Sequence, residues 1–543
     1  MVNAKESYPV DLLGIKELGI SKWLDNYYVP FKEEELHNIA TNILDAYFFT
    51  LKQFDNEVLY WLAISNVKIV DDVYYNYLSI LMLSRLQDRG FRYIISRDKR
   101  EIHKLLLDKD PLKLINFNKL VKDEWTSLTF RKKTENVIRL IKFNMSALKF
   151  SNWNFIKNIS GPYFMIGDRY TPAVYSYCTE KDIYPICLPV MLFSGNREDN
   201  SLTANEKVLV SQFIQCFMNS IKKIIPFIGE SAFEYLQNSL YEYFEYSMLF
   251  LKQNISCLRK MRKLKRKTLL ASSLGNLQTR LFCAAWRIAG GEVIGFTHGN
   301  NICINYNQTI IYDGVLITNC VVTTSSSQKI VYKHFVEKFT HKYKDSLKIA
   351  EITNFTKNRY RSIFAELQKE SSVDKINKVM VVGYPKPFFF YPWFPEHNIF
   401  TSLYIDIHVV KILKKAGFYV IYKPHPLTMN EAKDIFKEYV DDVVKEKFEK
   451  VINLADCILF YESNSTTFQY SLLSKKPLVL INVKGKLWYP KVLELLKKRC
   501  CLVDAYPADG RIVFNEKELI KAVESSLNNI DYEILYEFAF QKE

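Results

Sequence analysis

Pro424 and Pro426 enclose His425, directly after Lys423 and a β-prone stretch at 417–421. Each proline fixes its own φ near −65° and keeps the residue before it extended, so the strand is predicted to end in a stiff tip. A cation and an imidazole on such a tip suit a phosphate, because the histidine can donate a hydrogen bond or a proton to a leaving oxygen. The alternative is a surface turn whose polar side chains meet only water.

A second polar group follows the strand predicted at 457–460 and consists of Glu462, Ser463, Asn464, Ser465, Thr466 and Thr467. Hydroxyl and amide side chains at the start of a helix cap its free N–H groups. The same N–H groups and the helix dipole bind anions. Capping alone is the simpler explanation. We expect the two polar tips to lie on neighbouring β-α units of one sheet, where they would hold the phosphates of a nucleotide.

A third group, His298 with Gly299 and Asn300, follows a strand predicted at 292–297. Open α/β sheets bind ligands at the carboxyl ends of their strands, so this histidine is placed where chemistry is expected. A histidine that caps the core before a glycine turn is the alternative. Three further residues that follow predicted strands are weaker candidates: Gly383, Asp168 and Arg169.

The order of these motifs resembles bacterial surface-polysaccharide transferases of the GT-B fold. The matching motifs are HG at 298–299, KPHP at 423–426, SxSTT at 463–467 and KKP before an apolar strand at 475–481. The family includes Kdo- and sialic-acid-type capsule transferases, which use CMP-sugars, and teichoic-acid glycerophosphotransferases, which use CDP-glycerol. The resemblance covers residues 268–482. The HG is followed by two asparagines rather than a threonine, which departs from the glycerophosphotransferase pattern.

The resemblance implies an α/β, GT-B-like fold in which two doubly wound, Rossmann-like domains face a cleft, with a helical N-terminal elaboration. It implies a glycosyltransferase of capsule, O-antigen or lipopolysaccharide synthesis. Such an enzyme moves a sugar from a nucleotide-activated donor, with a CMP-linked sugar as the first hypothesis, to a glycan or lipid-linked glycan acceptor. A polyol-phosphate transferase that uses CDP-glycerol or CDP-ribitol and a non-catalytic nucleotide-binding scaffold are the alternatives.

The resemblance also implies roles for individual residues. His425 and Lys423 would contact the donor phosphate, and His298 would act on the acceptor hydroxyl as general base, a role that suits an imidazole near neutral pH. The implied donor-binding set is Lys423, Pro424, Glu462, Ser463, Asn464, Ser465, Thr466, Thr467 and Gly383. The implied acceptor-side set is Gly299, Asn300, Asp313, Asp168 and Arg169.

Asp313 lies in the sequence Ile311-Tyr-Asp-Gly314, which is similar to the acidic motif of sialyltransferases. Tyrosine replaces the first acid of that motif, so an aspartate at the start of a strand is the preferred interpretation. No DxD motif stands in a credible strand context, which is typical of a metal-independent enzyme. We expect no cofactor, since the nucleotide-activated donor is itself a substrate.

The elements that must position these residues follow from the spacing of apolar residues. Residues 1–150 are predicted to be largely helical, and 203–261 to form two long helices broken near Pro226. Strands alternate with helices over 268–299 and again over 378–482, which predicts parallel, doubly wound sheets. We therefore expect an acceptor-side domain, a Lys-rich helical connecting segment and a donor-binding domain, at 1–340, 341–377 and 378–543.

Composition restricts the setting of the protein. The chain has 543 residues and a net charge of +15, which favours an anionic partner. The densest basic cluster, Arg259–Lys267, has seven cations in nine residues, and no stacking or zinc-binding motif accompanies it. An anionic membrane surface therefore fits better than nucleic acid, and a solvated helix end is the alternative. With no apolar run near 18 residues, no signal peptide and no CxxC, we expect a cytoplasmic protein that is peripheral on the inner face of the membrane.

Overall fold

The computed structural model describes most of the helical and β structure of the chain. The described residues are 7–9, 15, 18–25, 27–28, 33–94, 163–166, 174–188 with short gaps, 201–225, 230–260, 267–296 except 273, 315–323, 329, 332–333, 348–350, 354–369, 373–384, 399–426, 435–485 except 464, 488, 491–508 and 511–540. Several predicted features lie outside these residues: Asp168, Arg169, His298, Gly299, Asn300, Asp313, Asn464, most of the basic cluster, and the first five residues of a helix expected at 430–440.

The first sheet has six described strands, all parallel, in the order β4-β3-β5-β6-β7-β8. Their bounds are β3 Tyr163–Ile166, β4 Ile186–Cys187, β5 Thr268–Ala271, β6 Glu292–Phe296, β7 Cys320–Val322 and β8 Lys348–Ala350. The helix α13 (Leu277–Ile288) connects β5 to β6 and is buried on all sides from Gln278 to Trp286, between the sheet and the helices described below. It begins at Asn276, whose side chain accepts a hydrogen bond from the Gln278 N–H.

The second sheet has seven described strands in the order β11-β10-β9-β12-β13-β14-β15, parallel except for β15. Their bounds are β9 Lys378–Val382, β10 Tyr419–Lys423, β11 Asp442–Val443, β12 Cys457–Phe460, β13 Leu478–Val483, β14 Cys501–Ala508 and β15 Arg511–Phe514. The two strands that follow β9 in the chain, β10 and β11, lie on one side of it in the sheet. The later strands, β12 to β15, lie in succession on its other side. This is the Rossmann order, with its reversal between β9 and β12.

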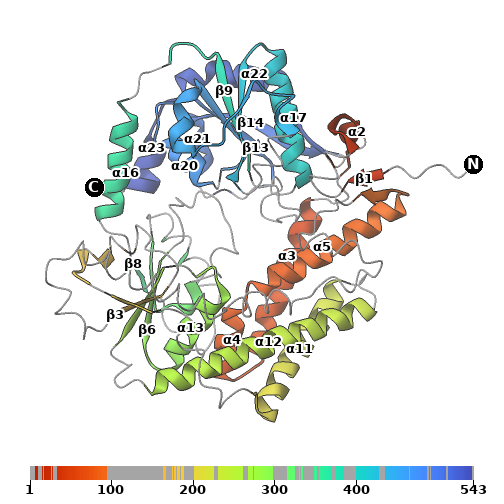
Figure 1. Ribbon diagram of the computed structural model, residues 1–543, viewed down its shortest axis with the longest axis vertical. Helices are drawn as coiled ribbons and strands as arrows, with labels where there is room; N and C mark the ends of the chain where they lie inside the picture. Colours follow the sequence, from red (N-terminus) through yellow and green to blue (C-terminus); the bar gives the residue numbers. More distant parts are fainter. Residues whose placement is uncertain are drawn as a thin grey trace, which may run out of the picture.

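Helices cover both faces of the second sheet (Figure 1). One face carries α17 (Ile399–Lys415) and α22 (Glu516–Ser525), and the other carries α16 (Asn354–Leu367), α20 (Thr466–Leu472), α21 (Val492–Arg499), α23 (Glu533–Leu535) and η8 (Tyr536–Phe540). Alternate strand residues face opposite layers, so Val379 and Val381 pack with the α17 layer and Met380 with the α20 layer. Burial on both faces explains why β13 is apolar at every position except Asn482.

The helical part lies beside the first sheet (Figure 1). It consists of α3 (Glu33–Lys52), α4 (Glu57–Ser65), α5 (Ile69–Asp88), α11 (Ala204–Ile224) and α12 (Glu230–Arg259). Thr203 and Glu206 form a capping box that fixes the start of α11. Every residue of α4 from Leu59 to Ser65 is buried, which is typical of a helix that is apolar all round.

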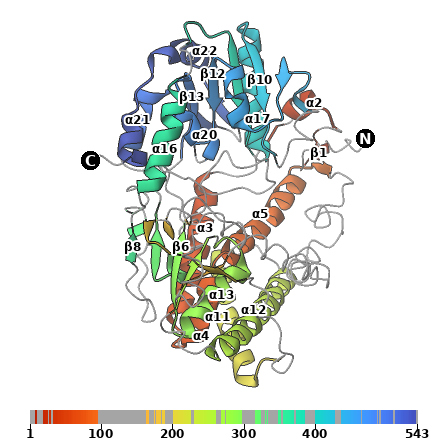
Figure 2. The same ribbon diagram turned by 60° about the vertical axis from the view of Figure 1, so that its left-hand side comes forward.

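Elements near the start of the chain pack against the second sheet rather than the first. β1 (Ser7–Pro9) pairs with β2 (Arg92–Ile94), and α2 (Ile20–Asp25) follows. The ring centroid of Tyr8 is 5.8 Å from that of Phe400, and that of Tyr27 is 4.4 Å from that of Tyr404. Both partners lie on α17, and Figure 2 shows β1 and α2 close to this helix.

The predicted fold class is confirmed: the protein is α/β, with two Rossmann-like parallel sheets and additional helices before and within the first. The two long helices expected in 203–261 are α11 and α12. The expected connecting segment, 341–377, contains α16 but also β8, which is the edge strand of the first sheet. The purely helical prediction was wrong there, because a three-residue strand, Lys-Ile-Ala, has no apolar run that would reveal it.

Further small elements complete the described chain: η4 (Val315–Ile317), α19 (Phe448–Val451), η6 (Ile452–Leu454) and η7 (Ser526–Asn528). No helix in the described part of the chain is both long enough and apolar enough to span a lipid bilayer.

Candidate functional site

The carboxyl ends of β10, β9 and β12 meet where the strand order of the second sheet reverses. Lys423 at the end of β10 is the register partner of Val382 at the end of β9, and Leu459 of β12 is the partner of Val381. The chain therefore leaves all three strands at one level. We call this place the reversal edge and define it as residues 383–384, 423–425 and 461–463.

The two predicted tips do lie on one edge of one sheet, but not on neighbouring strands. β9 lies between β10 and β12, which separates their backbones by roughly 10 Å. The expectation of adjacent β-α units was therefore wrong, because apolar spacing does not determine strand order. Placement on either side of a reversal point is the arrangement in which open α/β sheets bind ligands.

Lys423 is buried at this edge, with 5% of its surface exposed. Its Nζ donates a hydrogen bond to the carbonyl oxygen of Pro424 at 2.9 Å, so the ammonium also fixes the turn that carries His425. Burial lowers the pKa of Lys423, and the nearby carboxylates of Glu446 and Glu449 act in the opposite direction. The site thus holds a positive charge that is largely shielded from water.

His425 is half-buried and lies next to the tip of the central strand. Its ring centroid is 6.1 Å from that of Tyr384, with 45° between the ring planes. Tyr384 directly follows Gly383, the first residue after β9. The tips of β10 and β9 are therefore in contact through these two rings.

Gly383 faces the hydroxyl of Tyr422. A Cβ atom at position 383 would lie 2.2 Å from the Tyr422 hydroxyl oxygen and 2.7 Å from its Cζ. The Gly383 N–H also donates to the Lys423 carbonyl at 2.9 Å. The glycine is therefore required by close packing at the reversal edge, and its predicted contact with the donor stays a prediction.

We expect Gly383→Ala to destabilise the protein by about 1–3 kcal/mol, because the added methyl overpacks a fixed neighbour. Tyr422 cannot move aside easily, since its buried ring stacks on Phe436 at 3.9 Å. Urea denaturation measures the loss. Gly275→Ala is the matched control, because a Cβ there meets nothing within 4 Å. Equal stability of the two variants would contradict this account of Gly383.

The tip of β12 is largely closed to solvent. Glu462 is 3% exposed and Ser463 is fully buried, whereas Thr466 is exposed and Thr467 half-buried. Ser465 is the N-cap of α20, and its hydroxyl oxygen accepts a hydrogen bond from the Phe468 N–H at 3.0 Å. The simpler of the two explanations for this motif, helix capping, therefore accounts for Ser465.

Sequence reasoning missed three residues beneath this edge: Asp406, Tyr422 and Tyr461. Asp406 on α17 is fully buried, and the hydroxyls of Tyr422 and Tyr461 both donate to its Oδ2, at 2.8 and 3.4 Å. A signal was present, because Asp406 stands between Ile405 and Ile407 in a helix that is apolar on most sides. Such a carboxylate must be bonded internally, since an unpaired buried charge is costly.

Sequence reasoning also missed Arg499, the last residue of α21. Its guanidinium is fully buried and donates hydrogen bonds to backbone carbonyls at the end of α20 and in the loop that follows. The acceptors within 3.2 Å are Ser471, Leu472, Ser474 and Lys476. The arginine thus fixes the C-terminal end of the helix whose first turn carries the hydroxyl motif.

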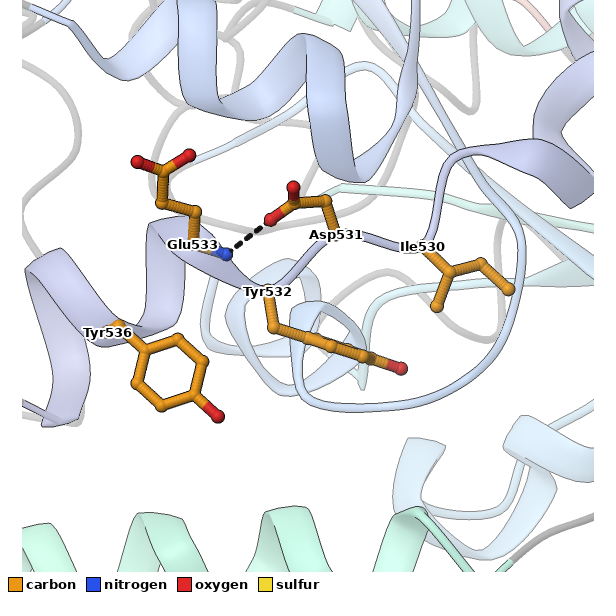
Figure 3. Close-up of a pocket in the computed structure, with 5 residues that line it drawn as sticks. All are labelled: Ile530, Asp531, Tyr532, Glu533 and Tyr536. Carbon is orange, nitrogen blue, oxygen red and sulfur yellow. Dashed lines mark hydrogen bonds between the residues drawn. The ribbon is translucent and has the colours of Figure 1, made fainter.

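A pocket of about 530 Å³ lies at α23, and none of its lining residues belongs to the reversal edge (Figure 3). It is lined by Ile530, Asp531, Tyr532, Glu533 and Tyr536. Its polar groups already have partners: Asp531 accepts from the Glu533 N–H at 2.6 Å, and the Glu533 carboxylate pairs with Lys498 at 2.5 Å. No cluster of three or more His, Cys, Asp or Glu side chains suited to a metal ion occurs within the described ranges.

No known family model matches the chain, and no curated protein sequence matches it. Solved structures with related architecture do. UDP-N-acetylglucosamine 2-epimerase from Rickettsia bellii is 13% identical, with a TM-score of 0.34 over 68% of this chain and 88% of that one. A glycosyltransferase from Rickettsia africae is also 13% identical, with a TM-score of 0.33 over 70% and 95%. S. aureus MnaA bound to UDP is 10% identical, with a TM-score of 0.33 over 70% and 98%. Superpositions this loose support no inference about activity, and the fold rests on the strand order.

Proposed function

We propose that this protein is a nucleotide-sugar-dependent glycosyltransferase of surface polysaccharide synthesis. It would transfer a sugar from an activated donor, with a CMP-linked sugar as the first candidate, to a glycan or lipid-linked glycan acceptor. The observation that carries the proposal is the reversal edge, where Lys423 and His425 stand on one side of β9 and Glu462 and Ser463 on the other. The basic cluster at 259–267 would rest on an anionic membrane surface.

The chemistry of the edge favours a phosphorylated ligand. A strand-order reversal gives a crevice at the carboxyl ends of the strands, and a nucleotide is a common occupant of such a crevice. The buried ammonium of Lys423 supplies positive charge in a place shielded from water, where its effect on a phosphate is stronger than at the surface. His425, half-buried and extended from a proline-stiffened turn, supplies a hydrogen-bond donor.

In the proposed reaction His425 and Lys423 neutralise the charge that develops on the leaving phosphate as the bond from the sugar to the phosphate breaks. His298 removes the proton from the acceptor hydroxyl as the new glycosidic bond forms. Gly299, Asn300, Asp313, Asp168 and Arg169 remain proposed acceptor contacts. The donor set on the β12 side remains Glu462, Ser463, Asn464, Ser465, Thr466 and Thr467.

The direct test is a thermal-shift screen against CMP-, CDP-, UDP- and GDP-linked donors, followed by a transfer assay with the donor that binds. Stabilisation by a nucleotide sugar and its turnover are the expected results. Stabilisation and turnover only with CDP-glycerol or CDP-ribitol would favour a polyol-phosphate transferase. Binding without turnover of any donor would favour a non-catalytic scaffold, and absence of all binding would refute the proposal.

Lys423→Met is expected to weaken donor binding at least tenfold with only a small change in stability. The affinity falls because a charge-assisted contact to phosphate is worth about 1.5–3 kcal/mol. Two effects on stability oppose each other: the variant loses the hydrogen bond to the Pro424 carbonyl, and it removes the cost of burying the ammonium, whose pKa is lowered in the folded state. In the wild type this cost applies below the folded pKa and disappears as pH rises through it toward the unfolded value.

Lys476→Met is the matched control for this prediction. Lys476 is 8% exposed and donates to the Ala455 carbonyl at 3.0 Å. Both residues lie at the amino ends of strands of the same sheet, opposite the carboxyl ends that form the reversal edge. Titration of the donor and urea denaturation of both variants separate the two effects. Equal donor affinity in the two variants would assign Lys423 a purely structural role.

A further inference from the structure

A buried carboxylate on α17 and two phenols connect strands β10 and β12 of the reversal edge. Asp406 projects from α17, Tyr422 belongs to β10 and Tyr461 directly follows β12. Tyr422 is 1% exposed, and both Asp406 and Tyr461 are fully buried. Because β9 lies between β10 and β12, the shared contact with Asp406 spans the strand-order reversal.

The Tyr461 hydroxyl has a second contact that Tyr422 does not share. It accepts a hydrogen bond from the backbone N–H of Tyr384 at 3.0 Å while donating its own hydrogen to Asp406. A hydroxyl has one hydrogen and two acceptor lone pairs, so both bonds can form together. Asp406 orients the phenol, and the phenol in turn holds the backbone of Tyr384.

This backbone position matters because of what the Tyr384 ring contacts. The ring lies 6.1 Å from that of His425, and Gly383 before it is fixed by the Lys423 carbonyl and by close packing on Tyr422. Burial raises the pKa values of both phenols well above 10, and Asp406 adds to the shift. The hydroxyls therefore stay protonated near neutral pH and remain donors to the carboxylate.

Stability alone gives little reason for a carboxylate in this place. Taking a carboxylate out of water costs several kcal/mol, and apolar residues of similar volume are often as stable as buried ionic groups or more so. The other side chains that α17 buries are mostly apolar, with Thr401 and Ser402 as neutral polar exceptions, so Asp406 is the buried acidic group of this helix. A fixed geometry at the edge above it is a function that an apolar side chain would not provide.

We propose that Asp406 and Tyr461 are positioning residues for the donor site: through the Tyr384 N–H they set the first two loop residues after β9, Gly383 and Tyr384, against His425, and thereby shape the cradle for the donor phosphate. The proposal rests on the proposed function for the identity of the ligand. The other part of the proposal, that Tyr461 fixes the backbone of Tyr384, rests on the hydrogen bonds alone.

The test compares Tyr461→Phe with Tyr422→Phe. Each variant removes one buried hydroxyl that donates to Asp406, so the two losses are closely matched, but only Tyr461→Phe frees the Tyr384 N–H. Amide hydrogen exchange, resolved to single residues by fragmentation, measures how well the Tyr384 N–H is protected by its hydrogen bond. Donor affinity is measured by titration with the nucleotide sugar that shows the largest shift in the thermal screen.

We expect exchange of the Tyr384 amide to rise roughly tenfold in Tyr461→Phe, with the Gly383 amide unchanged as an internal reference, because one neutral hydrogen bond is lost. Donor affinity is expected to fall roughly tenfold in the same variant. Tyr422→Phe should leave exchange of the Tyr384 amide near the wild-type value, because the Tyr422 hydroxyl does not bond that amide.

Failure of this positioning inference and failure of the proposed function would give different results. Unchanged exchange at Tyr384 in Tyr461→Phe would overturn the inference whatever the ligand is. Raised exchange with wild-type donor affinity would also overturn it, since the loop would then not matter to the site. If the wild type binds none of the nucleotides, the proposed function fails, and raised exchange confined to Tyr461→Phe would still support the hold on Tyr384.

Discussion

His425→Ala is expected to lower kcat by roughly 10²- to 10⁴-fold, the usual contribution of a positioned proton donor. The imidazole follows a turn fixed by Pro424, by the Lys423 ammonium and by the ring of Tyr384. In the proposed reaction, a side chain held this way would contact the leaving phosphate without a reorganisation cost in the transition state. Donor affinity should change less than kcat, because a proton donated late in the reaction stabilises the ground state little.

The measurement is steady-state transfer with the donor found in the screen, with circular dichroism as the check on folding. His408→Ala is the matched control, because His408 is another imidazole of the second sheet's layers, stacked on Tyr404 at 5.5 Å and edge-on to Phe514 at 5.3 Å. It should leave kcat within about threefold of the wild type. Comparable losses in the two variants, or none in His425→Ala, would remove His425 from the reaction.

Arg499→Met is expected to destabilise the protein by roughly 3 kcal/mol or more. The substitution removes the donor to the Leu472 and Lys476 carbonyls and one of several donors to those of Ser471 and Ser474, and each unsatisfied buried acceptor costs about 1–3 kcal/mol. The relief of a buried positive charge offsets part of this cost, since burial already lowers the pKa of the guanidinium. The net loss stays large, because the carbonyls at the end of α20 carry the negative end of its dipole.

Urea denaturation of Arg499→Met, Arg499→Lys and the wild type measures this contribution. Lysine retains the charge but brings only three donors instead of the five of the guanidinium fork, so its stability should be intermediate. A variant Arg499→Met within about 0.5 kcal/mol of the wild type would show that water replaces the lost donors. It would also contradict the conclusion that Arg499 fixes the C-terminal end of α20.

Apolar spacing was sufficient to place most of the elements in the two sheets. The second sheet illustrates this, because the strands at 378–382, 457–460 and 478–483 contain the apolar runs 379–382, 457–460 and 478–481 between helices of ordinary length. What spacing does not contain is the order of strands within the sheet. β10 and β12 were expected side by side, and β9 separates them, because each crossover leads to one side or the other of β9 without changing the sequence pattern.

The polar residues that support the candidate site were harder to predict than those within it. His425 stands out because two prolines flank it, and Lys423 because it directly precedes the first of them, whereas Arg499 ends a run of three cations that resembles a solvated helix end. Lys498 in that run does face solvent and pairs with Glu533, while its neighbour is fully buried. Which cation turns inward depends on helical phase relative to α20, and that phase is a property of packing.

The contact between the start of the chain and α17 has a consequence for biosynthesis. The rings of Tyr8 and Tyr27 emerge from the ribosome long before Phe400 and Tyr404, their partners, are translated. The α17 layer of the second sheet is therefore fully packed only after the segment that contains Tyr8 and Tyr27 has bound to it. A fragment that begins at 378 leaves the aromatic side of α17 uncovered, and such a surface promotes self-association of a nascent or truncated chain.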